Sequence, residues 1–241
     1  MKTTTRLPLF VLPFILMATL SLLYLGALAP DTLSTLFPNP LIDNAFIDAK
    51  LKYQLVTLGI AVLVLITTYF VSRKNAGVFY RVGNLQAPTA PIGWLGIKSS
   101  DTWKTVGRNF AVIISFVTLV FVYLNAARGQ NIDSAHMKYL PFILIFAMLN
   151  AFTEEAITRL SLVTVLHGLV PNSIIYLSSA LLFGIPHYFG VPGGLIGSLM
   201  AAFLGWLLSK SIVETQGLFR AWFIHFLQDV IIFSALFLVG L

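Results

Sequence analysis

Long runs of hydrophobic residues, separated by polar connections, make up most of the chain. The runs approach or exceed the ~20 apolar residues that a helix needs to cross a bilayer. This pattern predicts about seven membrane-spanning helices. Their approximate ranges are 7–29, 53–72, 109–125, 139–166, 172–190, 193–209 and 219–240. The first range begins as a signal sequence would, but its length and the lack of a convincing cleavage site favour a span.

The composition agrees with an all-α, polytopic transmembrane bundle. Of 241 residues, 58% are hydrophobic and only 10% are charged, whereas soluble domains carry about 25% charged residues. The chain has no cysteine, which excludes disulfides, thiolate nucleophiles and cysteine-ligated metals. The net charge of +6 does not indicate nucleic acid as a partner, because the basic residues cluster between spans and can face lipid headgroups.

The basic residues also predict an orientation. The connection 73–108 contains one acid, Asp101, against six basic residues: Arg73, Lys74, Arg81, Lys98, Lys104 and Arg108. Such an excess predicts that this connection and the N-terminus are cytoplasmic. The basic connection 210–220 falls on the same side, and the acidic connection 30–52 falls outside. We therefore expect an integral membrane protein, located in the plasma membrane if the host is a prokaryote.

The sixth predicted span has a small residue at every fourth position. These residues are Gly193, Gly197, Ala201, Gly205 and Ser209. A stripe of this kind lets two helices approach closely in lipid. It would serve either dimerisation or, as we favour, contact with a neighbouring helix of the same chain. The sequence does not predict the oligomeric state.

Charged residues interrupt the fourth predicted span at "LNAFTEEAITRL", residues 149–160. A charge at the bilayer centre costs at least ~2.5–3.5 kcal/mol, so such groups are usually paired and functional. Glu155 and Arg159 lie four residues apart and are predicted to form an ion pair on one helix face. Glu154 points about 100° away from Glu155 and needs a partner from another helix. Its own face carries two polar residues, Asn150 and Thr158.

Two histidines lie within predicted spans, and each has a partner four residues away. Phe183 precedes His187, so its ring can stack on the imidazole. Asp229 follows His225 and can accept its N–H, which would orient the ring. Three spans thus contribute groups suited to proton transfer, and almost nothing else ionisable is predicted inside the membrane. This pattern predicts one shared site.

Three motifs occur in order along these spans. They are two glutamates followed by three residues and an arginine, a phenylalanine and a histidine four apart, and a histidine with a polar residue four positions later. In this chain they are Glu154, Glu155 and Arg159, then Phe183 and His187, then His225 and Asp229. The set resembles the CPBP family, the CAAX prenyl endopeptidases and bacteriocin-processing enzymes, also described as the Abi family. The resemblance covers residues 139–240, so we divide the chain into N-terminal spans, 1–138, and a helical catalytic core, 139–241.

The resemblance implies an intramembrane endopeptidase that uses glutamate-activated water and no cofactor. Glu154, desolvated and without a local cation, suits a general base that holds water together with His187. His225 would stabilise the oxyanion, and Asp229 completes the catalytic set. Supporting roles fall to Glu155, Arg159, Phe183 and Asn150. The expected partners are the lipid bilayer and a membrane peptide or protein, prenylated or leader-type, that enters from the lipid or the cytoplasmic side.

The chain departs from the family pattern at three positions. Thr158 stands where an aromatic residue is usual, and Leu160 replaces a common glycine. Asp229 stands where asparagine is usual, and an ionised aspartate cannot donate to an oxyanion as an amide can. We hypothesise that Asp229 orients His225 and favours its cationic form, or is itself protonated.

Other functions stay open from the sequence. A zinc protease could use Glu154, His187 and His225 as ligands, but there is no His-Glu-x-x-His pair and Arg159 competes for Glu155. A non-catalytic immunity or peptide-binding protein could use the same polar cluster. A proton- or ion-coupled carrier is a third possibility, although the two halves show no inverted repeat.

Overall fold

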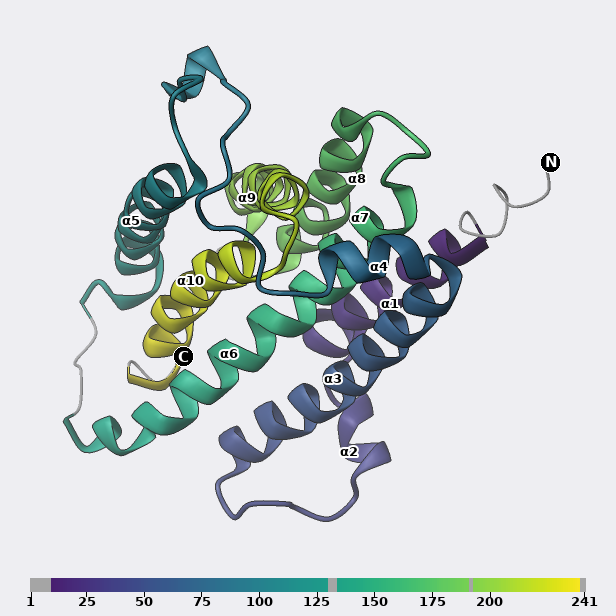
Figure 1. Ribbon diagram of the computed structural model, residues 1–241. Helices are drawn as coiled ribbons and strands as arrows, with labels where there is room; N and C mark the ends of the chain where they lie inside the picture. The colour runs from purple at the N-terminus through teal and green to yellow at the C-terminus, as the bar shows by residue number, and fades with distance from the viewer. Residues whose placement is uncertain (1–9, 130–133, 191–192, 239–241) are drawn as a thin grey trace.

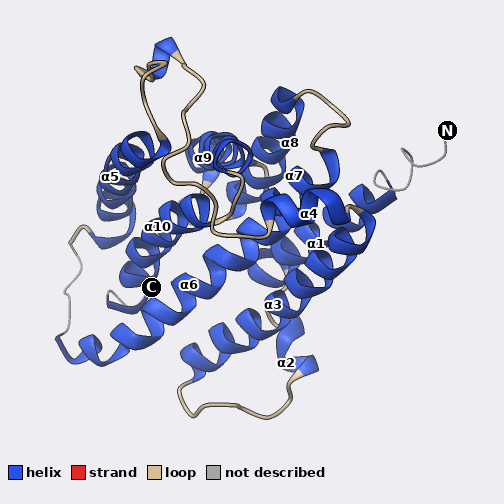
Figure 2. Cartoon of the chain, in the orientation of Figure 1, coloured by secondary structure: helices blue, strands red, loops and turns tan. Residues whose placement is uncertain are grey.

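The computed structural model describes residues 10–129, 134–190 and 193–238, which form a bundle of helices (Figure 1). Within these ranges the regular elements are helices, joined by loops that contain three isolated β-bridges (Figure 2). Five helices are long and apolar enough to cross a bilayer: Ala45–Val71, Trp103–Asn125, His136–Leu166, Gly194–Thr215 and Phe219–Leu238. The protein is therefore an all-α membrane bundle, as the sequence predicts.

The elements follow one another in this order: α1 (Leu12–Leu23), η2 (Tyr24–Leu28), α2 (Thr32–Leu36), α3 (Ala45–Val71), α4 (Arg73–Phe79), η3 (Gly93–Leu95), α5 (Trp103–Val122), η4 (Tyr123–Ala127), η5 (Ser134–Tyr139), α6 (Leu140–Glu155), η6 (Ala156–Leu160), α7 (Ser161–Leu166), α8 (Asn172–Gly184), η7 (Pro186–Phe189), α9 (Gly194–Thr215) and α10 (Phe219–Leu238). The elements η2, η4 and η6 are π-helical turns, and η3, η5 and η7 are 3₁₀ turns.

Two of the seven predicted spans are shorter than a full crossing. The first is the apolar helix Leu12–Leu28. The range 172–190 contains the 13-residue helix α8, which ends at Gly184 and continues as the 3₁₀ turn η7. Pro186 explains this break, because proline has no N–H for the helical ladder and its ring clashes with the preceding turn. The shortening brings His187 into the bundle.

The small-residue stripe of α9 packs against α8 of the same chain, and this pair is the most extensive helix contact in the described bundle. Ser179 Oγ donates to the carbonyl of Gly205 at 3.2 Å. A Cβ at Gly205 would lie only 2.8 Å from the Ser179 carbonyl oxygen, so a larger residue would push the helices apart. The stripe therefore serves the intrachain contact that we favoured from the sequence.

The segment α6–η6–α7 is the central element, and α3 and α10 pack along it. Every residue from Glu155 to Leu166 is buried. A π-helical turn, η6, begins directly after Glu155. Such turns are rare and occur frequently at functional sites.

Two ends of the bundle are defined by contacts between their connections. At one end, which we call the basic end, Asn75 donates to the carbonyl of His167 at 2.9 Å, and Arg81 donates to the side chain of Gln216 at 2.9 Å. The connection 80–102 also lies there, and its tip reaches the top of Figure 1.

At the opposite end, which we call the α2 end, Asn44 donates to the Tyr139 hydroxyl at 3.4 Å. The rings of Phe46 and Phe237 meet edge to face there, with centroids 4.9 Å apart. This end lies toward the bottom of Figure 1.

Several basic residues that the sequence placed in connections lie within helices instead, among them Lys210 and Arg220. Lys210 is buried in α9 and forms an ion pair with Glu214. Arg220 is buried in the first turn of α10, where its aliphatic stem covers Gly107 of α5. The connection between α9 and α10 is consequently only three residues long, 216–218. Both basic residues still belong to the basic end.

Candidate active site

Glu155 and Arg159 form the predicted ion pair, and both side chains are fully buried. Glu155 is the last residue of α6 and Arg159 lies in η6, at the centre of the bundle. One guanidinium nitrogen, Arg159 Nη1, donates to Glu155 Oε1. The guanidinium also lies over the ring of Phe183, with 3.8 Å between its central carbon and the ring centroid. Arg159 is thus held both by a carboxylate and by an aromatic face, which is a favourable arrangement for a desolvated cation.

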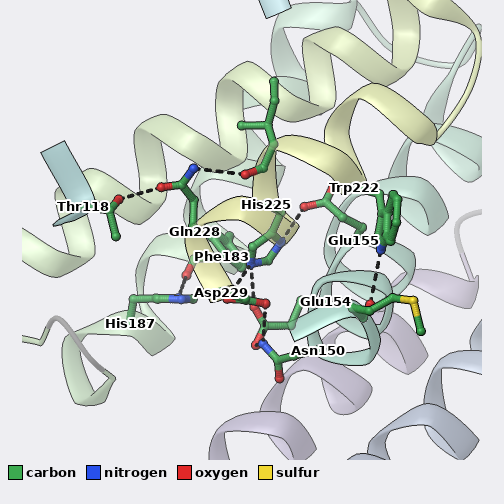
Figure 3. A network of polar contacts seen from close by, with 12 residues as sticks. Thr118, Asn150, Glu154, Glu155, Phe183, His187, Trp222, His225, Gln228 and Asp229 are labelled. Carbon is green, nitrogen blue, oxygen red and sulfur yellow. Dashed lines mark hydrogen bonds and ion pairs between the residues drawn. The ribbon is translucent and has the colours of Figure 1, made fainter. Parts of the chain in front are cut away.

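His225 of α10 joins this pair, which the sequence did not predict. Its Nδ1 lies 2.8 Å from Glu155 Oε1, the same oxygen that accepts from Arg159 (Figure 3). A carboxylate can only accept, so Nδ1 carries the proton of this hydrogen bond. The other ring nitrogen, Nε2, consequently points toward the remaining two carboxylates of the site.

Those two carboxylates belong to Glu154 and Asp229. His225 Nε2 is 3.5 Å from Glu154 Oε2 and 3.6 Å from Asp229 Oδ1. We expected Asp229 to orient His225, but the shorter contact that fixes the ring comes from Glu155. The cause is the helix packing, because α10 brings its imidazole against the face of α6 that carries Glu155.

Asn150 connects Glu154 to Asp229. Its amide nitrogen donates to Glu154 Oε1 at 3.2 Å and to Asp229 Oδ2 at 3.1 Å (Figure 3). The amide oxygen accepts from Gln54 of α3 at 3.4 Å. Gln54 was missed by the sequence reasoning, although a buried glutamine within an apolar helix was the signal that could have found it. Thr158, the other predicted member of this polar strip, donates to the Glu154 backbone carbonyl at 2.7 Å.

Phe183 of α8 touches both histidines. Its ring centroid lies 4.2 Å from that of His187 and 5.3 Å from that of His225. His187 Nδ1 is 2.7 Å from the Phe183 backbone carbonyl. A carbonyl accepts, so Nδ1 carries a proton and Nε2 of the neutral ring is left as an acceptor. The four-residue spacing therefore fixes both the position and the tautomer of His187.

A cavity of about 650 Å³ contacts only one of the two adjacent glutamates, Glu154. Glu154, His187, Asp229 and Asn150 line it, together with Tyr53 of α3. Glu155 and Arg159 are fully buried behind this wall. The site thus contains one glutamate that a substrate or water can reach and one that is enclosed.

The alternative zinc ligands do not form a metal site. Within residues 10–129, 134–190 and 193–238, no three His, Asp or Glu side chains are arranged to hold a metal ion. Glu155 is already bonded to Arg159 and His225.

A helical membrane bundle with carboxylates and imidazoles around one internal cavity has the groups that hydrolytic chemistry requires. Residues 136–231 match the family model described as Type II CAAX prenyl endopeptidase Rce1-like. No curated protein and no solved structure matches the chain significantly. The matched region runs from η5 into α10 and contains all three motifs. Over this region the chain is similar to the CAAX protease (CPBP) family, and this similarity supports a protease.

Proposed function

We propose that this protein is an intramembrane endopeptidase that hydrolyses a peptide bond in a membrane-associated peptide or protein. In this proposal the attacking water is activated by Glu154 and His187. The observation that carries it is the meeting of Glu154 from α6 and His187 from η7 on one cavity, with His225 and Asp229 of α10 beside them. Glu154 is the one glutamate of the pair that the cavity exposes.

The residues divide the reaction between them. Glu154 accepts a proton from the water while the oxygen of the water bonds to the peptide carbonyl carbon. His187 Nε2 accepts a hydrogen bond from the second O–H of the water. The carbonyl oxygen becomes an oxyanion, to which a protonated His225 Nε2 donates. The carbon–nitrogen bond then breaks, and Glu154 returns its proton to the leaving amine. Carboxylate oxygens face both nitrogens of the His225 ring, so a proton on either nitrogen has an acceptor.

Positioning of the site is the role that we assign to Glu155, Arg159 and Phe183. Glu155 fixes Nδ1 of His225, and Arg159 pairs with the Glu155 carboxylate in the protein interior. Phe183 keeps the two imidazoles apart and in place by contacting both rings. None of the three needs to touch the substrate.

We further propose that catalysis needs no metal. If so, purified protein stripped with a chelator and returned to metal-free buffer keeps its full turnover. A loss of activity that added Zn²⁺ restores would overturn this part of the proposal and favour a zinc mechanism.

The central test compares two glutamates in turnover by purified protein. Glu154→Gln removes the proposed base and should lower turnover by about 10²–10⁴-fold. Glu214→Gln is the matched control, because it makes the same change at the basic end, away from the cavity. Thermal unfolding in detergent verifies that both variants fold.

Substrates for this assay come from the host. Membrane peptides that accumulate uncleaved in cells carrying Glu154→Gln, identified by mass spectrometry, are synthesised and offered to the purified protein. If the unaltered protein bound these peptides specifically but did not cleave them, the result would contradict the proposed endopeptidase activity and favour the non-catalytic peptide-binding function.

A further inference from the structure

The cavity is built from only one half of the bundle's length. Its lining comes from 19–34, 48–53, 150–158, 182–190 and 229–236, and includes no residue from the connections of the basic end. The exposed lining residues include Gly26, Pro30, Asp31, Ser34 and Phe189. All of these lie on η2, the connection that carries α2, or η7. The cavity therefore opens at the α2 end.

Charge distinguishes this opening from the other end of the bundle. The connection 73–108 carries six basic residues against Asp101, and Lys210 and Arg220 lie at the same end. The connection 29–44, which borders the opening, has two acids, Asp31 and Asp43, and no lysine or arginine.

Few basic residues lie elsewhere at the α2 end. Near the start of α3, Lys52 is paired with Asp48 at 2.6 Å. The remaining described basic residues there are Lys50, Arg128 and Lys138. An asymmetry of this kind in short connections places the basic end in the cytoplasm.

From these two observations together we infer that the catalytic cavity opens on the non-cytoplasmic face of the membrane. The substrate would then be an exported or membrane-inserted peptide whose cleaved bond lies at that face. The C-terminus of a cytosolic, prenylated protein would be on the wrong side. The sequence led us to expect substrate access from the lipid or the cytoplasm. Access from the cytoplasm would start at the basic end, whose connections contribute no lining residue to the cavity. The substrate class rests on the proposed protease function, whereas the direction of the opening does not.

The opening suits a peptide that leaves the lipid on that side. Its rim combines apolar groups, such as the half-exposed ring of Phe189, with the charged side chains of Asp31 and Lys50. From the rim the cavity passes Tyr53 and reaches Glu154 and Asp229. An extended peptide could therefore keep apolar side chains toward the lipid while its backbone enters a polar interior.

Single-cysteine labelling tests the direction of the opening. The chain has no cysteine, so each introduced thiol is unique. Ser34→Cys lies at the rim and Ser99→Cys lies in the basic connection, and both positions are exposed serines. In right-side-out membrane vesicles, a membrane-impermeant maleimide should label Ser34→Cys at once and Ser99→Cys only after permeabilisation. The reverse pattern would overturn the inference.

A second measurement links the opening to substrate access. In the same vesicles, external maleimide should cause Ser34→Cys to lose most of the turnover that it had before labelling, because the adduct blocks the rim. Ser99→Cys, labelled after permeabilisation, should keep its turnover. Unchanged turnover in fully labelled Ser34→Cys would show that substrate uses another route and would overturn the inference.

The two proposals fail in different ways. A protein that labels as expected but cleaves no membrane peptide would refute the protease function and leave the orientation standing. If the protein cleaved peptides added at the cytoplasmic face but not peptides added at the opposite face, the inferred substrate class would be refuted and the protease function would stand.

Discussion

Among the described residues three ion pairs have the same four-residue spacing, and two of them, Glu155–Arg159 and Lys210–Glu214, serve different parts of the molecule. Glu155–Arg159 lies at its centre, with both side chains fully buried. Lys210–Glu214 lies at the basic end, where the Glu214 side chain keeps 14% of its exposure. Around the first pair the additional contact is a histidine from α10. Around the second it is the indole N–H of Trp103, which donates to Glu214 at 2.9 Å.

This difference shows that the same i, i+4 ion pair has a different role when it is fully buried than when it is partly exposed. At the basic end the Glu214 side chain keeps some exposure, and it ties the connection 80–102 to α9 by accepting from Trp103 and from the backbone N–H of Ala90. At the centre no water replaces a missing partner, so the charges of Glu155, Arg159 and His225 must be satisfied by one another. We therefore expect that the two pairs respond to equivalent substitutions with effects of different size.

The largest stability effect is predicted for Arg159→Met. Methionine keeps the length and the contact with Phe183 but leaves Glu155 buried without its cation. Breaking a buried pair in this way costs about 3–5 kcal/mol in the free energy of unfolding. Reversible unfolding in mixed micelles measures it. The double variant that also carries Glu155→Gln should recover part of the loss, because it removes the uncompensated charge.

A smaller loss is predicted for Glu214→Gln at the basic end. Glutamine retains an oxygen that can accept from Trp103 or from Lys210, and the partly exposed position 214 lets water approach the new side chain. We expect a loss of about 0.5–1.5 kcal/mol by the same unfolding measurement. A loss as large as that of Arg159→Met would mean that the two ion pairs contribute equally to stability. It would contradict the expectation that the more deeply buried pair contributes more.

The sequence predicted the central pair better than its surroundings. The i, i+4 spacing of Glu155 and Arg159 is a local property, and a local rule was sufficient. The contact between Glu155 and His225 joins residues 70 positions apart, and it depends on how α10 crosses α6. Lys210 and Arg220 were placed in a connection because a hydropathy pattern ends where charges begin, whereas α9 and α10 continue through them.

The same limit applies to the cavity and to the spans. Three motifs on three helices predicted a shared site, and the structure gathers Glu154, His187, His225 and Asp229 around one cavity or its wall. Their catalytic roles stay predictions until turnover is measured. Periodicity did not predict the π-helical turn η6, and Gln54 was overlooked although a glutamine within an apolar run is visible in the sequence. Hydropathy likewise counted seven spans without showing that α8 is only 13 residues long.

The smallest effect is predicted for Asp229→Asn. In the structure Asp229 accepts from Asn150 at 3.1 Å and lies 3.6 Å from His225 Nε2, while Glu155 already fixes the ring at 2.8 Å. Orientation of His225 therefore does not depend on a carboxylate at position 229. Asparagine keeps an oxygen that can accept from Asn150, and its amide adds a donor for the oxyanion.

We expect turnover by Asp229→Asn to equal or exceed that of the unaltered protein, measured on the same peptide as Glu154→Gln. Complete loss of turnover with folding intact would show that the reaction requires a negative charge at this position. The site would then depend on two carboxylates facing the cavity, and Glu154 alone would no longer account for activation of the water.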